Sequence, residues 1–260
     1  QLRSSNKKFA KYFKVKYCTV KMDSYQVDGQ TIRYAEIGDD TLPLVIFVHG
    51  APGELGNYQA FLADSSLYTK AHLISVDRAG YGYSGFGKSV PSIEEQAKYI
   101  QPLLAKNKSA KKPILVGHSY GGPIIARMAM DFPEQIGGLI LAAPALDPEQ
   151  EKYFWVNKPV SWWAFRWLVP RVFRVANDEK LAHADELTLM LPHWDKINIP
   201  ITYIHGEADG LVPYGNTDFA KKVLTNAAVD FVLEKEMGHL IPWKRPELIH
   251  DAVLKHVERN

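Results

Sequence analysis

A serine between two glycines is the first feature of this sequence that could carry out chemistry. Gly117, Ser119 and Gly121 form the pattern Gly-x-Ser-x-Gly, which follows the apolar run 113–116 and precedes a helical pattern from near Pro123. A sharp strand-to-helix turn exposes the serine hydroxyl, and small glycines allow that turn to close. The spacing therefore predicts a nucleophile elbow with Ser119 as the nucleophile.

A serine hydroxyl is a weak nucleophile and needs a base, which this kind of turn places later in the chain, after an acid. His239 follows the last expected strand and is predicted to be the base. Asp209 follows the strand before it and is predicted to be the acid that orients the imidazole. Glu207 and Asp147 are the alternatives for the acid.

Acyl transfer also needs two backbone N–H groups that bind the oxygen on which negative charge develops. The first is the N–H of Tyr120, directly after the serine. The second is expected from the loop 49–53, which follows a buried strand, and Ala51 is the candidate because Pro52 has no N–H. His49 is expected to hold this loop through hydrogen bonds.

These residues follow short apolar runs that alternate with segments of helical spacing. The alternation predicts an α/β fold, with a mostly parallel central sheet and helices on both faces. The alternating segment 31–37 follows the turn-forming Asp28-Gly29 and predicts antiparallel strands at the start of the sheet. The expected parallel strands are 44–48, 72–76, 114–116, 139–142 and 201–204, the last strand is 229–233, and two expected helices are 92–104 and 123–131.

A length of 260 residues suits one catalytic domain with an insertion. Residues 23–146 and 195–260 are expected to form the core, and residues 1–22 a basic segment that leads into the first strand. Residues 147–194 are too long for one crossover helix and are expected to form a helical lid. Aromatic side chains are frequent there, and those expected to line a substrate pocket are Trp155, Trp162, Trp163 and Trp167.

Composition excludes several classes of function. The balance of 31 basic and 29 acidic residues leaves a net charge of +2, so no nucleic-acid partner is expected. Cys18 is the only cysteine, which excludes an intrachain disulfide and a cysteine-rich metal site, and no metal or cofactor is expected.

No run of about 18 apolar residues occurs, so no segment is expected to span a membrane. The chain begins at Gln1 with a basic stretch before its first acidic residue, Asp23. We expect that something was removed upstream, either a signal or anchor or a trimmed segment, and expect membrane contact only through such a segment. Localisation and oligomeric state stay open.

Two phosphate-binding patterns overlap within residues 80–89, but nucleotide binding is not expected. Pro91 forces Val90 into an extended conformation, so Lys88 does not open a helix that could receive phosphates. The glycine run is also not followed at once by a helical pattern, as a dinucleotide site requires.

Five motifs together resemble the α/β-hydrolase superfamily over nearly the whole chain: HGAPG, DRAGYGYSG, GHSYGG, GEADGLVP and GHLIPW. The resemblance implies a serine esterase or lipase that forms an acyl-enzyme on a small apolar ester or acyl substrate. The first motif is also similar to loops of epoxide hydrolases and dehalogenases, which have an aspartate in place of Ser119, and of proline iminopeptidases, which usually have a glycine in place of Ala51. Peptidase or amidase activity, carbon–carbon bond hydrolysis and non-catalytic binding of a small ligand are the alternatives.

Overall fold

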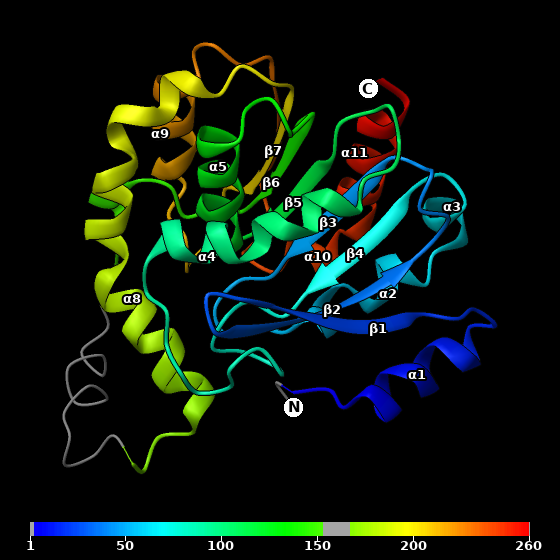
Figure 1. The fold of residues 1–260 in the computed structure, drawn as a ribbon. Coiled ribbons are helices and arrows are strands. Elements are labelled where there is room, and N and C mark those ends of the chain that lie inside the picture. Colours follow the sequence, from blue (N-terminus) through cyan, green and yellow to red (C-terminus); the bar gives the residue numbers. More distant parts are fainter. Residues whose placement is uncertain (1–2, 153–166, 260) are drawn as a thin grey trace.

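The computed structural model describes residues 3–152 and 167–259, and an eight-stranded sheet forms its centre (Figure 1). The strand order is β1-β2-β4-β3-β5-β6-β7-β8. β2 pairs antiparallel with β1 and with β4, and all pairs from β4 to β8 are parallel. The strands are β1 (Lys21–Val27), β2 (Gln30–Ile37), β3 (Leu44–Val48), β4 (His72–Val76), β5 (Ile114–His118), β6 (Gly138–Ala142), β7 (Ile201–Gly206) and β8 (Val229–Glu234). The predicted fold class, a mostly parallel sheet with an antiparallel start, is confirmed.

Helices cover both faces of this sheet, as the alternation predicted (Figure 1). The α-helices are α1 (Asn6–Val15), α2 (Gln59–Leu62), α3 (Ser65–Tyr68), α4 (Ile93–Ile100), α5 (Gly121–Asp131), α8 (Arg171–Met190), α9 (Gly215–Val223), α10 (Ile241–Lys244) and α11 (Pro246–Arg259). Short 3-10 helices are η1 (Leu55–Tyr58), η2 (Gln101–Lys106), η3 (Pro148–Gln150) and η4 (Leu191–Lys196).

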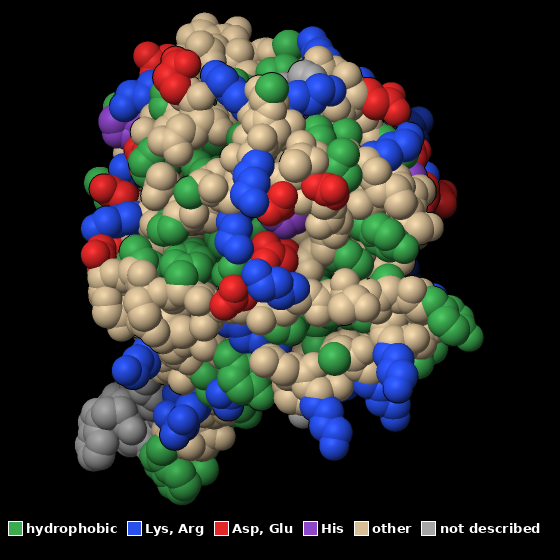
Figure 2. All heavy atoms as spheres, turned by 45° about the vertical axis from the view of Figure 1, so that its right-hand side comes forward, with side chains coloured by type: hydrophobic (Ala, Val, Ile, Leu, Met, Phe, Trp, Pro, Cys, Tyr) green, Lys and Arg blue, Asp and Glu red, His purple; other side chains and the backbone are tan. Residues whose placement is uncertain are grey.

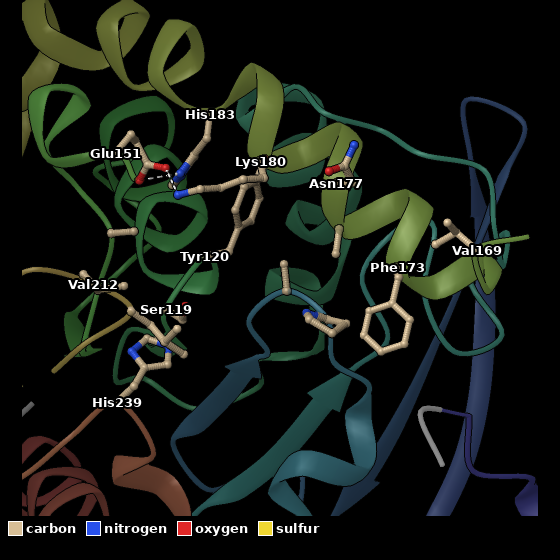
Figure 3. Close-up of a pocket in the computed structure, with 15 residues that line it drawn as sticks. Ser119, Tyr120, Glu151, Val169, Phe173, Asn177, Lys180, His183, Val212 and His239 are labelled. Atoms are coloured by element: carbon tan, nitrogen blue, oxygen red, sulfur yellow. Dashed lines mark hydrogen bonds and ion pairs between the residues drawn. The ribbon is translucent and has the colours of Figure 1, made fainter. Parts of the chain in front are cut away.

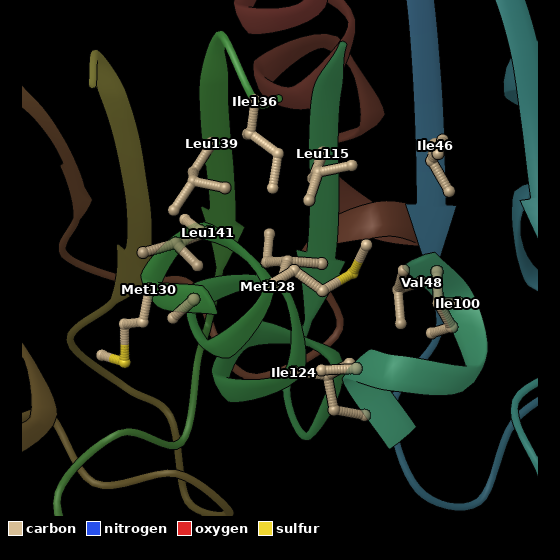
Figure 4. Packing of buried hydrophobic residues seen from close by; sticks show 14 of the residues in the cluster. Ile46, Val48, Ile100, Leu115, Ile124, Met128, Met130, Ile136, Leu139 and Leu141 are labelled. Atoms are coloured by element: carbon tan, nitrogen blue, oxygen red, sulfur yellow. The ribbon is translucent and has the colours of Figure 1, made fainter. Parts of the chain in front are cut away.

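The alternation of side chains along each strand divides the core into two hydrophobic clusters, one on each face. In β3, Leu44, Ile46 and Val48 belong to the cluster under α4, α5, α8 and α9, whereas Val45 and Phe47 belong to the cluster under α1, α3 and α11. Figure 4 shows part of the first cluster, where side chains of α5 pack against those of β5 and β6. Packing on both faces thus holds the parallel strands in register, with their carboxyl ends side by side at one edge of the sheet.

The segment between β6 and β7 contains η3, α8 and η4, and so differs from a simple crossover. α8 is a helix of 20 residues that runs along one side of the domain (Figure 1). Residues 153–166 of this insertion lie outside the described part of the chain. Within the ranges 3–152 and 167–259, no helix combines the length and apolarity that crossing a bilayer requires.

The glycine-rich segment 80–89 forms a loop and not the start of a helix. Its shape is maintained by buried Asp77, whose carboxylate accepts hydrogen bonds from the N–H groups of Leu55 at 2.8 Å and Tyr83 at 3.0 Å. α4 begins only at Ile93, after an N-cap at Ser92. A loop held in this way has a structural role and lacks the helix N-terminus that phosphate binding requires.

Candidate active site

Ser119 occupies a tight turn between β5 and α5, as the glycine spacing predicted. Its φ angle is +55°, a left-handed conformation that non-glycine residues rarely adopt. The turn is secured by hydrogen bonds from Ser119 N–H to Ala142 O at 3.0 Å and from Gly122 N–H to Ser119 O at 2.9 Å. A Cβ atom on Gly121 would lie 2.3 Å from Val48 O, so only glycine fits there. The surrounding backbone therefore holds Ser119 in a strained conformation, and its side chain is half-buried.

His239 and Asp209 are in direct contact although they come from different loops. His239 Nδ1 lies 2.7 Å from Asp209 Oδ2, while Asp209 Oδ1 accepts hydrogen bonds from the N–H groups of Leu211 at 2.8 Å and Val212 at 2.9 Å. Burial of Asp209 would raise its pKa, but these hydrogen bonds and the charge of His239 outweigh burial and keep the pKa below its usual value. An ionised carboxylate only accepts, so Nδ1 carries the proton and Nε2 is left as the base.

Ser119 and His239 line the same cavity, which has a volume of about 560 Å³. Figure 3 shows the ring of His239 next to Ser119 at one end of this cavity. Tyr120 and Ala51, the two candidates for oxyanion binding, line it as well. The structure therefore brings together all five residues that the sequence analysis selected for the reaction.

The alternative acids do not reach the histidine. Glu207 is exposed, and Asp147 serves as the N-cap of η3, where its side chain accepts a hydrogen bond from Glu149 N–H at 3.0 Å. Of the three carboxylates that the sequence left open, Asp209 is the one that contacts His239.

His118, the residue before the serine, contacts the backbone of the predicted base, His239. Its Nε2 lies 2.9 Å from the backbone oxygen of His239, and the two rings are 4.7 Å apart. Burial and the neighbouring His239 lower the pKa of His118 to about 3, so this ring stays neutral. The neutral ring donates a hydrogen bond from Nε2 to the backbone oxygen of His239 and so holds the loop that carries His239.

His49 holds the loop of Ala51, as expected from the sequence. Its Nδ1 lies 2.7 Å from Gly50 O, and its Nε2 accepts a hydrogen bond from Arg78 N–H at 3.1 Å. Burial and the charge of Arg78 lower the pKa of His49, so the ring is neutral and suited to donate at one nitrogen and accept at the other.

A buried ion pair that the sequence analysis missed secures the same loop. Arg78 donates to His49 O at 2.9 Å and Gly50 O at 3.2 Å, and its remaining donors contact the Glu179 carboxylate at 2.7 and 3.1 Å. The side chains of Arg78 and Glu179 are both fully buried. Tyr81 also donates to Glu179, at 2.6 Å. Glu179 lies on α8, so the insertion is tied to the loop that carries one candidate oxyanion donor.

A second polar group lines the cavity beside its apolar walls. Glu151 accepts hydrogen bonds from Lys180 and from His183 Nδ1, the latter at 3.0 Å, and the His183 ring stacks on Tyr120 at 4.5 Å (Figure 3). Burial of Glu151 would raise its pKa, but His183 and Lys180 outweigh burial and lower it. The sequence analysis selected none of these three residues for the site. The signal was the three-residue spacing of Asn177, Lys180 and His183, which places all three on one face of a helix.

The four tryptophans expected in the pocket have different outcomes. Trp155, Trp162 and Trp163 lie outside the described residues. Trp167 is 70% exposed and is not among the described residues that line the cavity, so its assignment to the pocket is corrected. It precedes α8 and stays in solvent, whereas Val169 and Phe173 supply the apolar wall at that end of the cavity.

Comparisons with known proteins agree with this architecture. Residues 43–167 match the family described as alpha/beta hydrolase fold. A dihydrolipoyllysine-residue acetyltransferase component of the acetoin cleaving system from Cupriavidus necator is 29% identical over 119 residues, which is 45% of this chain. The matched part is only 30% of that relative's length.

Two solved structures share the fold at low sequence identity. A membrane phospholipase A, a bacterial virulence factor, superposes with a TM-score of 0.70 at 20% identity, over 97% of this chain and 92% of that one. An epoxide hydrolase from Vigna radiata has a TM-score of 0.71 at 14% identity, over 93% of this chain and 98% of that one. The family match over residues 43–167, the eight-stranded sheet and the turn at Ser119 together show that this chain has the α/β-hydrolase fold.

Proposed function

We propose that this chain is a serine hydrolase that cleaves a carboxylic ester, or a related acyl bond, through an acyl-enzyme. The observation that carries the proposal is the contact of His239 with buried Asp209 at a cavity that also exposes Ser119. An imidazole that a carboxylate orients, in the same cavity as a strained serine, is the arrangement that activates a hydroxyl for attack.

In the proposed reaction, Ser119 Oγ attacks the acyl carbon while His239 Nε2 takes its proton. The N–H groups of Tyr120 and Ala51 bind the oxyanion of the tetrahedral intermediate. His239 then gives its proton to the leaving alcohol, and a water molecule that His239 deprotonates releases the acyl group from Ser119. The negative charge of Asp209 stabilises the imidazolium that forms in both steps.

The cavity favours a small, mainly apolar substrate. Its walls include Leu211, Val212, Phe173 and Val169, and its volume of about 560 Å³ is within the range of small-molecule sites. The likeness in fold to a phospholipase A structure is consistent with an ester of this kind. Apart from the water that releases the acyl group, the proposed steps use side chains and backbone groups of this chain.

The test is hydrolysis of p-nitrophenyl esters from acetate to long acyl chains by the wild type and by Ser119→Ala. We expect kcat to fall by at least about 10³-fold in Ser119→Ala, because the nucleophile is lost while the cavity stays intact. Ser24→Ala is the matched control, since Ser24 is exposed on β1, and it should leave kcat unchanged.

A fluorophosphonate probe supplies an independent readout, because it labels only an activated serine. Labelling of Ser119 together with ester turnover supports the proposal. Labelling without turnover on any ester contradicts ester specificity and favours an amide or carbon–carbon substrate. If neither labelling nor turnover is detected, the reaction is refuted and the cavity is a binding site for a small ligand.

A further inference from the structure

The charge of this protein is concentrated at its amino-terminal end. Seven of the 31 Lys and Arg residues, and none of the 29 Asp and Glu residues, lie in residues 1–22. This segment therefore carries +7, whereas residues 23–260, with 24 basic and 29 acidic residues, carry −5. Such an asymmetry indicates a surface that binds an anionic partner.

The basic segment has a fixed orientation because α1 packs firmly on the domain. Phe9 and Phe13 are each 1% exposed and belong to the hydrophobic cluster on that face of the sheet. Ser4, just before α1, hydrogen-bonds buried Glu54 through its hydroxyl at 2.6 Å, and Arg33 donates to Ser4 O at 3.1 Å. The opposite, exposed face of the segment carries Lys7, Lys8, Lys11, Lys14 and Lys16. This set is called the lysine face.

Exposed apolar side chains lie on the same side of the molecule. Tyr17, just past α1, is 98% exposed, and Trp167 and Leu168 are 70% and 61% exposed. In Figure 1 the chain that leads into α8, where residues 167–168 lie, and α1 are at opposite ends of the lower edge of the molecule. In Figure 2 this lower side shows blue basic and green hydrophobic side chains.

This side also leads to the cavity. Val169, which directly follows Leu168 in the chain, lines it together with Phe173, and Phe173 is 48% exposed.

We propose that the lysine face, with Tyr17, Trp167 and Leu168, docks the protein on an anionic lipid bilayer. Lysines near an anionic bilayer are attracted to its surface potential, and aromatic and aliphatic side chains beside them enter the headgroup region. A nucleic acid would attract the lysines by charge but would not bind the apolar side chain of Leu168. The sequence analysis expected membrane contact only through an upstream segment, whereas α1 provides a surface within this chain. Docking goes beyond the proposed reaction and does not require turnover.

Co-sedimentation with lipid vesicles tests the proposal. We expect the wild type to bind phosphatidylcholine vesicles that contain phosphatidylglycerol, and to bind pure phosphatidylcholine weakly. Binding should also weaken in high salt, because the screening length shortens to about 3 Å at 1 M. Each lysine near the surface contributes about fivefold in binding, so reversing Lys7, Lys11 and Lys14 to Glu should reduce vesicle binding by at least about 100-fold.

A second charge-reversal variant separates a local effect from net charge. Lys196, Lys222 and Lys235 are exposed and lie outside α1, so their reversal to Glu changes the net charge equally. This control should lose far less vesicle binding than the α1 variant. Circular dichroism and turnover of a soluble p-nitrophenyl ester should be unchanged in both variants, because neither set touches the cavity.

Three outcomes would overturn the docking surface: equal loss of binding in the two variants, equal binding of the wild type to neutral and anionic vesicles, or binding to heparin or single-stranded DNA without binding to vesicles. A Trp167→Ala/Leu168→Ala variant must also bind anionic vesicles less tightly than the wild type, and unchanged binding would refute the apolar part. Repeating the vesicle assay with Ser119→Ala separates the two proposals, since docking should persist when turnover is lost.

Discussion

Replacing Glu179 with glutamine should destabilise the protein and impair the reaction together. Glu179 is fully buried, and its carboxylate accepts bonds from Arg78, from Tyr81 at 2.6 Å and from Gln96 at 3.1 Å. In Glu179→Gln the guanidinium of Arg78 stays buried without a counter-charge, and the new amide N–H groups face other donors.

The expected magnitude follows from the burial of the pair. Breaking a buried ion pair by removing one partner costs about 3–5 kcal/mol, because one charge is left uncompensated. For a chain of this size, about 2–4 °C is lost per kcal/mol, so the melting temperature should fall by about 6–20 °C. A loss of this size is a large part of the total stability of a typical domain.

The effect on the reaction comes through the backbone that Arg78 holds. Arg78 donates to the carbonyl oxygens of His49 and Gly50, next to the Ala51 N–H that is proposed to bind the oxyanion. A shift of this loop weakens a contact made mainly in the transition state, so kcat should fall by up to about 100-fold while KM changes little. Urea denaturation and ester kinetics on the same samples measure both effects.

Asp185→Asn is the matched control, because Asp185 lies on the same helix but is exposed. It removes one negative charge without affecting a buried partner, and surface changes of this kind are usually within about 0.5 kcal/mol. If Glu179→Gln and Asp185→Asn unfold within about 1 kcal/mol of each other and have equal kcat, Arg78 is not held by Glu179 in the way we describe.

Three further predictions concern the acid, the turn and the pH dependence of stability. Asp209→Asn should lower kcat by about 10⁴-fold in ester kinetics, because an amide no longer selects the correct tautomer of His239. Gly121→Ala should lower the free energy of unfolding by about 1–3 kcal/mol through overpacking, whereas Gly210→Ala, with open space around its Cβ position, should not. His256→Gln should make stability depend less steeply on pH between 6.5 and 4, measured by urea denaturation.

The sign of the pH effect follows from burial of His256. Burial lowers the pKa of His256 from 6.5 to about 4 in the folded chain. Between these values the unfolded chain binds a proton that the folded chain does not, so stability falls as the pH falls, by about 1.4 kcal/mol per pH unit at most. An unchanged slope in His256→Gln would contradict this source of acid sensitivity.

The outcomes of the other two predictions are equally distinct. Retained activity in Asp209→Asn would mean that another group orients His239. The kcat of Asp147→Asn would then be measured, to see whether the loss expected for Asp209→Asn occurs there instead. Equal stability of Gly121→Ala and Gly210→Ala would show that the backbone at Val48 relaxes to admit a methyl group.

The sequence by itself determined the features that depend on neighbours along the chain. The turn at Ser119 follows from glycines two residues away on each side, and the strands follow from short apolar runs, because both patterns reflect local backbone geometry. Chain order also placed an acid and a histidine at the carboxyl ends of strands, where open sheets gather their sites. The orientation of α1 could not be predicted from local patterns, because it depends on where Phe9 and Phe13 pack in the tertiary structure.

Only the tertiary structure decided which of these side chains meet. Asp209, and not Glu207 two residues earlier, contacts His239, because the loop after β7 turns one carboxylate inward and leaves the other in solvent. Arg78 and Glu179 are 101 positions apart, and no local pattern links them. A buried charge is tolerated only where a partner arrives from elsewhere in the chain, so such pairs, and the cavity walls they support, become visible only once the packing is known.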